Sequence, residues 1–285
     1  NIEITIEANP GAVDSEQFRS YIEAGINRLS IGAQSFNNKH LEKLGRIHSK
    51  EDTITAINIA KSVGFQDLNV DLMHGLPGQS VESAIEDLKI AADNAPTHIS
   101  WYQLTIEPNT YFYSYPPRLP EDIILDTIHE RGIEVLENNG YSQYEVSAFA
   151  QKSKNSSHNC NYWNFGDYFG VGPGAHGKLT KFEESGVRIF RTNKLKQPAS
   201  YIKNPTHTFI KEVSAAESIP EFLMNVLRLK DGVDRWTFEK RTGLLFEEIQ
   251  GEWKNLSDRG LVEPGRCKTT ELGFRYLDSI LRAFV

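Results

Sequence analysis

Alternating and helical patterns of apolar residues divide the first 140 residues into strands and helices. Apolar positions alternate with polar ones in four short segments, which predicts strands at 2–7, 28–34, 66–72 and 98–104. Between them apolar residues recur at helical spacing, which predicts helices at 15–24, 37–44, 50–63, 81–92 and 120–139. This alternation indicates an α/β fold with parallel strands joined by right-handed crossovers, as in a barrel or a doubly wound sheet.

The rest of the chain predicts two further domains. Residues 141–177 are crowded with aromatic side chains, glycine and asparagine, and a long structured segment of this kind usually serves a site. From Ser218 onward three helical patterns, a short strand and a last helical pattern follow one another in a winged-helix-like order. The predicted domains are therefore 1–140, 141–217 and 218–285.

Each of the four predicted parallel strands carries a polar residue near its carboxyl end, namely Glu7, Gln34, Asp71 and Gln103. Right-handed crossovers bring these ends to one edge, which carries the active site in α/β barrels. Asp71 is the strongest candidate because it lies near the end of a buried strand, beside His74. An unpaired buried charge costs several kcal/mol unless something binds it, so its presence there indicates a binding site. Taken singly, each is equally well explained as a solvated strand end, but four in succession favour a site.

Arg46 follows a short predicted helix and can pair with a carboxylate on the same edge, although a surface arginine is the simpler interpretation. In the segment HNCNYW, His158 can act as an axial haem ligand, with Tyr162 and Trp163 as flat walls and Cys160 as a second candidate ligand. Composition alone favours the alternative, a histidine hydrogen-bonded within a loop. No cysteine and histidine spacing typical of zinc occurs.

Glycines 172, 174 and 177 match the dinucleotide fingerprint G-x-G-x-x-G, but no apolar strand precedes them and no amphipathic helix follows. The same stretch, GPGAHGK, fails as a phosphate-binding loop because Leu179 stands where Ser or Thr is required. We therefore reject both sites. The stretch predicts a sharply bent backbone that another group approaches closely.

Composition adds three expectations. The chain has 285 residues with 39% hydrophobic and 24% charged residues, and without an apolar run or leader-like segment it predicts a cytoplasmic protein. The net charge of −7, with eleven basic and eleven acidic residues from Pro220 to Val285, argues against a nucleic-acid partner. The two cysteines, Cys160 and Cys267, are too few for a cubane iron–sulfur cluster, so no metal ligand is assigned within the chain.

Several motifs together resemble the HemW haem chaperones of the radical S-adenosylmethionine superfamily, which are related to oxygen-independent coproporphyrinogen III oxidase. The motifs are IEANPG, LSIGAQSF, GRIH, VDLMHGLPGQ, WYQLTIEP, HNCNYW and GVGPGAHG, and they cover almost the whole chain. The resemblance implies a partial (β/α)6 barrel with a winged-helix-like helical C-terminal domain. The family's CxxxCxxC motif for a 4Fe-4S cluster is absent. Because the chain begins at Asn1 in a strand-like run, we expect the first two βα units and that motif upstream of it, and no catalysis by this chain alone.

The resemblance also implies ligands and partners. Glu7, Gln34, Arg46 and Asp71 occupy positions that hold S-adenosylmethionine, and His158 lies in the HNxxYW pattern associated with haem. The implied partners are haem or porphyrin and a membrane-bound haem acceptor. The alternative function is radical decarboxylation of coproporphyrinogen III, although Arg46 is the only evident arginine for its propionates. A nucleic-acid-binding protein with a winged-helix tail is a third, less favoured reading.

Overall fold

The computed structural model describes residues 2–12, 14–184 and 186–285. These residues form two compact units, one up to Asn155 and one from Ser156 to Val285, each with its own hydrophobic core. The expected domain boundaries after residues 140 and 217 stay predictions. Within the described ranges, no helix is both long and apolar enough to cross a bilayer.

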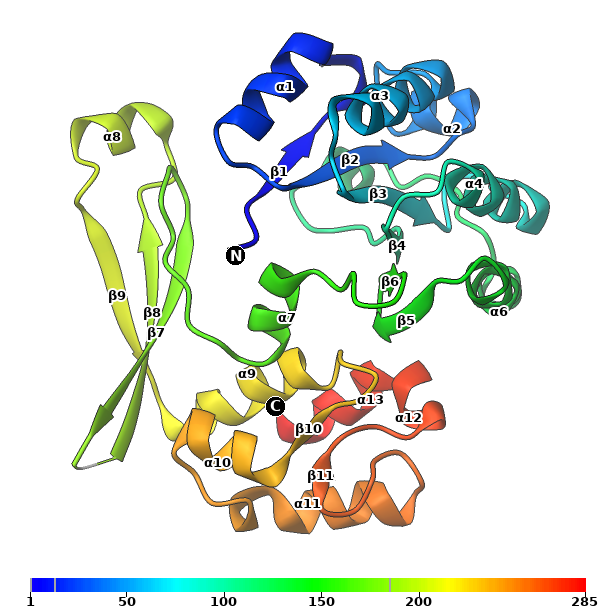
Figure 1. The fold of residues 1–285 in the computed structure, drawn as a ribbon. Helices are drawn as coiled ribbons and strands as arrows, with labels where there is room; N and C mark the ends of the chain where they lie inside the picture. Colours follow the sequence, from blue (N-terminus) through cyan, green and yellow to red (C-terminus); the bar gives the residue numbers. More distant parts are fainter. Residues whose placement is uncertain (1, 13, 185) are drawn as a thin grey trace. The chain divides into compact units, whose positions relative to one another are not determined.

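The first unit is built on a six-stranded sheet in the order β1-β2-β3-β4-β6-β5 (Figure 1). Strands β1 to β4 pair in parallel, and this confirms the α/β alternation predicted from the sequence. Strand β6 is antiparallel to both β4 and β5, and the β5-β6 hairpin was not predicted from the sequence pattern. The strands are β1 (Thr5–Ala8), β2 (Arg28–Gln34), β3 (Asp67–His74), β4 (His98–Gln103), β5 (Ser142–Glu145) and β6 (Ala148–Ala150).

Helices connect the parallel strands and begin and end where the sequence supplies caps. Helix α3, for example, starts at a reciprocal capping box between Ser49 and Asp52 and ends at Gly64, whose φ of 110° suits glycine. The helices of this unit are η1 (Pro10–Ala12), α1 (Ser15–Glu23), α2 (Asn38–Lys43), α3 (Lys50–Val63), α4 (Val81–Asp93), α5 (Tyr111–Ser114) and α6 (Asp122–Asn138).

The two faces of the parallel strands differ in chemistry. On one face, apolar side chains such as Leu29, Val70 and Ile99 are fully buried in the core with residues of the helices. On the other face, the strands present Ser30, Asn69, Asp71, His98 and Ser100, which follow from the two-residue alternation and the observed register. The sheet therefore has one apolar side toward the helices and one polar side.

The second unit combines an antiparallel sheet, in the order β7-β8-β9, with a helical subdomain that holds the small pair β10-β11. The strands are β7 (His176–Glu183), β8 (Gly186–Lys194), β9 (Thr208–Val213), β10 (Val233–Asp234) and β11 (Arg266–Cys267). The helices are α7 (Ser157–Trp163), α8 (Pro198–Lys203), α9 (Ala215–Val226), α10 (Arg235–Thr242), α11 (Glu247–Asp258), α12 (Glu271–Arg275), α13 (Leu277–Leu281) and η2 (Arg282–Phe284).

Two expectations about the second unit can be compared with the structure. The prediction of a single last helix was wrong, because the chain leaves the helical conformation at Tyr276 and forms two short helices, α12 and α13. The bent glycine stretch is confirmed, since Gly172 and Gly174 have φ of 112° and 71° and a Cβ on Gly177 would meet Thr192 of β8.

We expect Gly132→Ala to destabilise the first unit. A Cβ at Gly132, inside α6, would overlap the ring of Trp101, which is buried and has no room to move. Overpacking of this kind typically costs about 1–3 kcal/mol, which exceeds the gain of up to about 1 kcal/mol from removing a helical glycine. Urea unfolding would measure the loss.

Gly251→Ala is the matched control, because Gly251 also lies inside a helix, α11, and nothing stands within 4 Å of its added Cβ. It should be neutral or stabilising by up to about 1 kcal/mol. Equal stability of the Gly132→Ala protein and the wild type would contradict the packing described for α6.

Candidate functional site

Asp71 is held by two neighbours on the polar face of the sheet. Its Oδ2 accepts a hydrogen bond from the Ser30 hydroxyl at 2.8 Å, and its Oδ1 accepts one from Asn69 Nδ2 at 2.8 Å. Asn69 Nδ2 also donates to Ser30 Oγ at 2.7 Å, so the three side chains form a closed triangle. The half-buried carboxylate is thereby fixed in orientation while part of it faces outward.

The hydrogen-bond network continues below Asp71 through neutral groups. Because Asn69 Nδ2 is a donor, its Oδ1 must accept, and it does so from Ser100 Oγ at 3.1 Å and from His98 Nδ1 at 2.6 Å. His98 therefore carries its proton on Nδ1, and Nε2 accepts from the Tyr144 hydroxyl at 2.8 Å. Burial, and next the positive charge of the buried Arg28, lower the pKa of His98 to about 3, so the imidazole is neutral. Asp71 is the charged member of the hydrogen bonds described here, and Arg28 is a cation close to them.

Gln34 ends β2 in a strained conformation. Its φ is 65°, which is unusual for a residue other than glycine, and the pairing of β2 with β3 is irregular between Ile31 and Gln34. The side-chain Oε1 accepts a hydrogen bond from the Tyr102 hydroxyl at 2.7 Å. Gly32 leaves room for it, because a Cβ there would lie 3.1 Å from Gln34 Nε2. Such strain is commonly found at functional sites.

Tyr102 is hydrogen-bonded to Gln34 and lies within the electrostatic influence of the other candidate residues. Burial raises its pKa, and the charges of Asp71 and Glu7 raise it further. Arg46 and the hydrogen bond with Gln34 act in the opposite direction. The structure thus brings together the four residues selected from the sequence in the first unit, with Glu7 and Arg46 both exposed.

Two contacts anchor the loops that carry these residues. His48 is buried in the loop after Arg46, and its Nε2 lies 3.0 Å from the carbonyl oxygen of Ala33, to which it donates. The buried Asp87 of α4 accepts hydrogen bonds from the Ser35 hydroxyl and the Phe36 N–H, both at 2.7 Å. Gln34 is therefore fixed through the residues on either side of it.

Two residues named in the strand-end pattern lie elsewhere. Gln103 was the wrong choice on β4: Ser100 pairs with Asp71, so Ser100 and Tyr102 share its face while Gln103 points to the other side. His74 is buried against Trp101, with ring centroids 4.3 Å apart, and burial lowers its pKa to about 3. The sequence signal for Tyr102 was present, since it stands two residues after the polar Ser100 in ISWYQ.

The chemical character of this edge follows from its donors and acceptors. Asp71, Glu7 and the Gln34 amide offer oxygen acceptors, Arg46 offers a fixed positive charge, and Tyr102 contributes a neutral hydroxyl. A small ligand that combines hydroxyl or ammonium donors with a carboxylate would satisfy both kinds of group.

In the second unit, helix α7 carries the HNCNYW residues. His158 is exposed, and its Nε2 lies 2.9 Å from the Tyr162 hydroxyl, one helical turn away. Tyr162 packs edge-on against Tyr168 at 4.5 Å between ring centroids. Trp163 anchors the helix, with the Arg228 guanidinium 4.3 Å from its ring centroid. The imidazole of His158 is thus exposed to solvent, while Trp163 on the same helix packs against the rest of the second unit.

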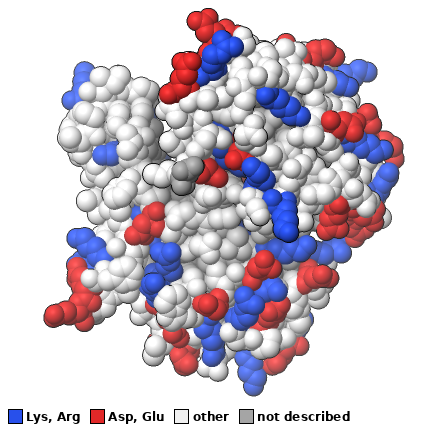
Figure 2. Space-filling view, viewed as in Figure 1, with Lys and Arg blue, Asp and Glu red and all other residues white. Residues whose placement is uncertain are grey.

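The cysteines lie in different surroundings. Cys160 is half-buried on α7, whereas Cys267 is fully buried in β11, where burial raises its thiol pKa to about 12. Among the described residues there is no group of three or more His, Cys, Asp or Glu side chains able to hold a metal ion. The surface of the second unit facing the viewer in Figure 2 mixes basic and acidic side chains.

Known proteins resemble the chain over its whole length. Residues 1–91 match the Radical SAM superfamily and residues 213–276 match the HemN C-terminal domain. The curated Heme chaperone HemW of Haemophilus influenzae is 45% identical and is aligned over 100% of this chain and 74% of its own length. That of Escherichia coli is 44% identical over 99% of this chain and 75% of its own length.

Among solved structures, coproporphyrinogen III oxidase (HemN) from Escherichia coli superposes with a TM-score of 0.79 at 21% identity. The match covers 99% of this chain and 69% of that protein. At this level of identity the likeness shows a shared fold alone.

Asp87 provides a pH test of the loop that fixes Gln34. Burial raises its pKa from 3.8 to about 6, so the folded protein binds a proton more readily than the unfolded chain. The resulting stabilisation is complete below about pH 4 and is lost as pH rises through about 6. Asp87→Asn does not ionise, so its unfolding free energy should improve relative to wild type by up to about 3 kcal/mol between pH 4 and pH 7.

Urea unfolding across this pH range would measure the difference. Asp93→Asn, an exposed site at the end of the same helix, should keep the pH dependence of the wild type. A constant difference between Asp87→Asn and wild type at all pH values would show that Asp87 is not buried as described.

Proposed function

Because the chain belongs to the HemW family of radical S-adenosylmethionine proteins, we propose that it is a haem chaperone. In this proposal the second unit binds haem through His158, and the polar edge of the first unit binds S-adenosylmethionine. The proposal includes a membrane-bound protein as the haem acceptor, which the family resemblance implies, and the cytoplasm as the compartment, which is the expectation from composition.

The observation that carries the proposal is the presentation of His158. Its imidazole is exposed on α7, so a planar iron porphyrin can approach it without unfolding the helix. The Tyr162 hydroxyl lies 2.9 Å from Nε2 and fixes the orientation of the ring, so iron would bind at Nδ1, or at Nε2 once Nε2 leaves this hydrogen bond. The inward Trp163 holds the helix in place. These features fit an axial haem ligand better than a histidine buried in a loop.

The first unit fits S-adenosylmethionine by the chemistry of its donors. Asp71 and Glu7 would accept hydrogen bonds from ribose hydroxyls or the ammonium group, Gln34 would add an amide, and Arg46 would pair with the carboxylate. When bound, the molecule supplies an activated sulfonium-linked nucleoside. The closed triangle of Ser30, Asn69 and Asp71 keeps the acceptor oriented without consuming its outward lone pairs.

A 4Fe-4S cluster, which the superfamily implies, does not fit the residues of this chain. Cluster binding takes at least three thiolates, whereas the chain has two cysteines and burial holds Cys267 in its protonated form. The function proposed for these residues is therefore the binding of haem and of the nucleoside.

Haem titration of the 285-residue chain tests the proposal. The wild-type chain should give a shifted haem absorption band, and His158→Ala should remove the shift or weaken binding about tenfold or more, because the axial ligand is lost. The matched control is His207→Ala in the same unit, since His207 is also exposed and packs on an aromatic ring at the same centroid distance of 4.6 Å. Equal spectra for the two variants, or no band shift in the wild type, would reject His158 as the ligand.

A further inference from the structure

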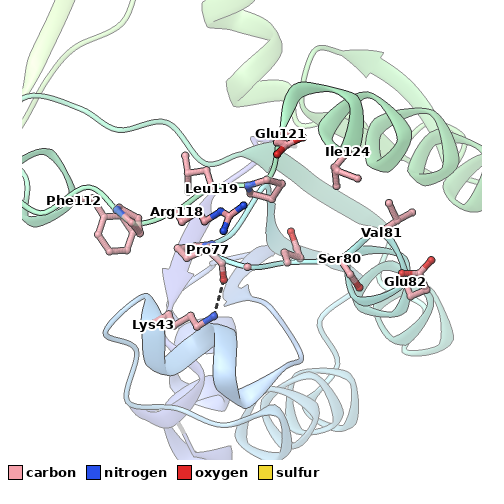
Figure 3. A pocket seen from close by; sticks show the side chains of 14 residues that line it. Lys43, Pro77, Ser80, Val81, Glu82, Phe112, Arg118, Leu119, Glu121 and Ile124 are labelled. Carbon is pink, nitrogen blue, oxygen red and sulfur yellow. Dashed lines mark hydrogen bonds between the residues drawn. The ribbon is translucent and has the colours of Figure 1, made fainter.

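A large pocket of about 970 Å³ opens in the first unit beside the candidate site (Figure 3). Its walls come from segments that follow the carboxyl ends of β2, β3 and β4: the end of α2, the turn into α4, and the segment that leads into α6. The pocket therefore lies at the carboxyl-terminal edge of the sheet, the edge that also carries Asp71 and Gln34, but it is lined by none of the residues assigned above.

Two cations line this pocket without a carboxylate partner among the described residues. Lys43 donates through Nζ to the carbonyl oxygen of Pro77 at 2.9 Å, and the Arg118 side chain makes no hydrogen bond or ion pair there. Figure 3 shows both side chains reaching toward the loop that contains Pro77. Of the two acids in the lining, Glu82 lies 3.8 Å from Arg131, and Glu121 precedes α6 as its N-terminal cap residue without a side-chain capping hydrogen bond, exposed to solvent. Unpaired cations in a concave surface favour an anionic ligand.

A buried amide points to the same class of ligand. Gln79 lines the pocket and is only 4% exposed, and its Oε1 accepts from the Leu76 N–H at 3.2 Å. Its Nε2 has no acceptor within the described part of the chain. A buried donor left unsatisfied costs about 1–3 kcal/mol, which an oxygen-bearing ligand would recover. The first turn of α4 also lines the pocket, and its dipole favours negative charge.

Part of the lining is apolar and is continuous in the chain with exposed aromatic rings. Phe112, Leu119 and Ile124 line the pocket. Phe112 belongs to the short helix α5, on which Tyr111 and Tyr113 are 73% and 58% exposed, and the next residue, Tyr115, is 68% exposed. Adjacent exposed aromatic side chains are typical of surfaces that contact a flat apolar molecule.

We propose that this pocket binds the carboxylate end of a flat, apolar ligand, with Lys43 and Arg118 at the carboxylates and Phe112 against the apolar body. Resting on the proposed function, this ligand is the tetrapyrrole, held by its propionate edge. The pocket is a binding site in the first unit, separate in its residues from His158.

Binding of metal-free protoporphyrin IX and of its dimethyl ester to the full 285-residue chain separates carboxylate recognition from iron ligation. The wild type should bind the free acid about tenfold more tightly than the ester, because only the acid can pair with the two cations. Arg118→Gln and Lys43→Gln should each reduce this preference about threefold, and the double variant should remove it. Porphyrin fluorescence reports both affinities.

Lys39→Gln is the matched control, since Lys39 is exposed on the same helix as Lys43 and does not line the pocket. It should keep the preference for the free acid. The Arg118 side chain makes no hydrogen bond or ion pair with the described residues, so the result for Arg118→Gln is independent of the Lys43 contact with Pro77. An unchanged preference in the double variant, or an equal loss in Lys39→Gln, would overturn the site.

The outcome is distinct from that of the haem titration. If the haem band depends on His158 but the preference for the free acid is unchanged in the Lys43 and Arg118 variants, the proposed function is supported and the pocket is rejected. If there is no haem band but protoporphyrin binding still depends on the two cations, the pocket is supported and the assignment of His158 as haem ligand is rejected.

Discussion

The parallel pairing of β1 to β4 is the constraint on which the candidate site depends. It aligns the carboxyl ends of the strands, and the two-residue alternation then sends apolar side chains to the helices and polar ones to the opposite face. A shift of one residue in the pairing of a strand with its neighbour would turn its apolar side chains to the polar face and its polar side chains to the helices. The polar face is tolerated because its groups satisfy one another, from Asp71 through Asn69 to His98 and Tyr144.

This satisfied network explains why one charge can remain at the edge. Buried polar groups cost free energy unless they are hydrogen-bonded, and here neutral side chains supply the donors to Asp71. The strained backbone at Gln34 is a second cost, of order 1–3 kcal/mol, that has to be offset nearby. The contacts of His48 with Ala33 and of Asp87 with Ser35 and Phe36 hold the chain on both sides of it.

Much of the first unit could be predicted from the sequence because its patterns are local. The alternation over 28–34 and 66–72 fixed the strands and put Asp71 and Gln34 near their ends, and glycine and capping residues marked the helices. Tyr102 was missed and Gln103 chosen because which face a side chain takes depends on register with a neighbouring strand. The β5-β6 hairpin and the clamp by Asp87 also depend on partners distant in sequence, and so left no local pattern.

Binding of S-adenosylhomocysteine, measured by titration calorimetry, tests whether the polar face around Asp71 forms a nucleoside site. We expect the wild-type chain to bind it and Asp71→Asn to weaken binding about tenfold or more. Gln103→Ala should change nothing, because Gln103 lies on the other face. No binding by the wild type, or an equal loss in the two variants, would contradict a nucleoside site on this face.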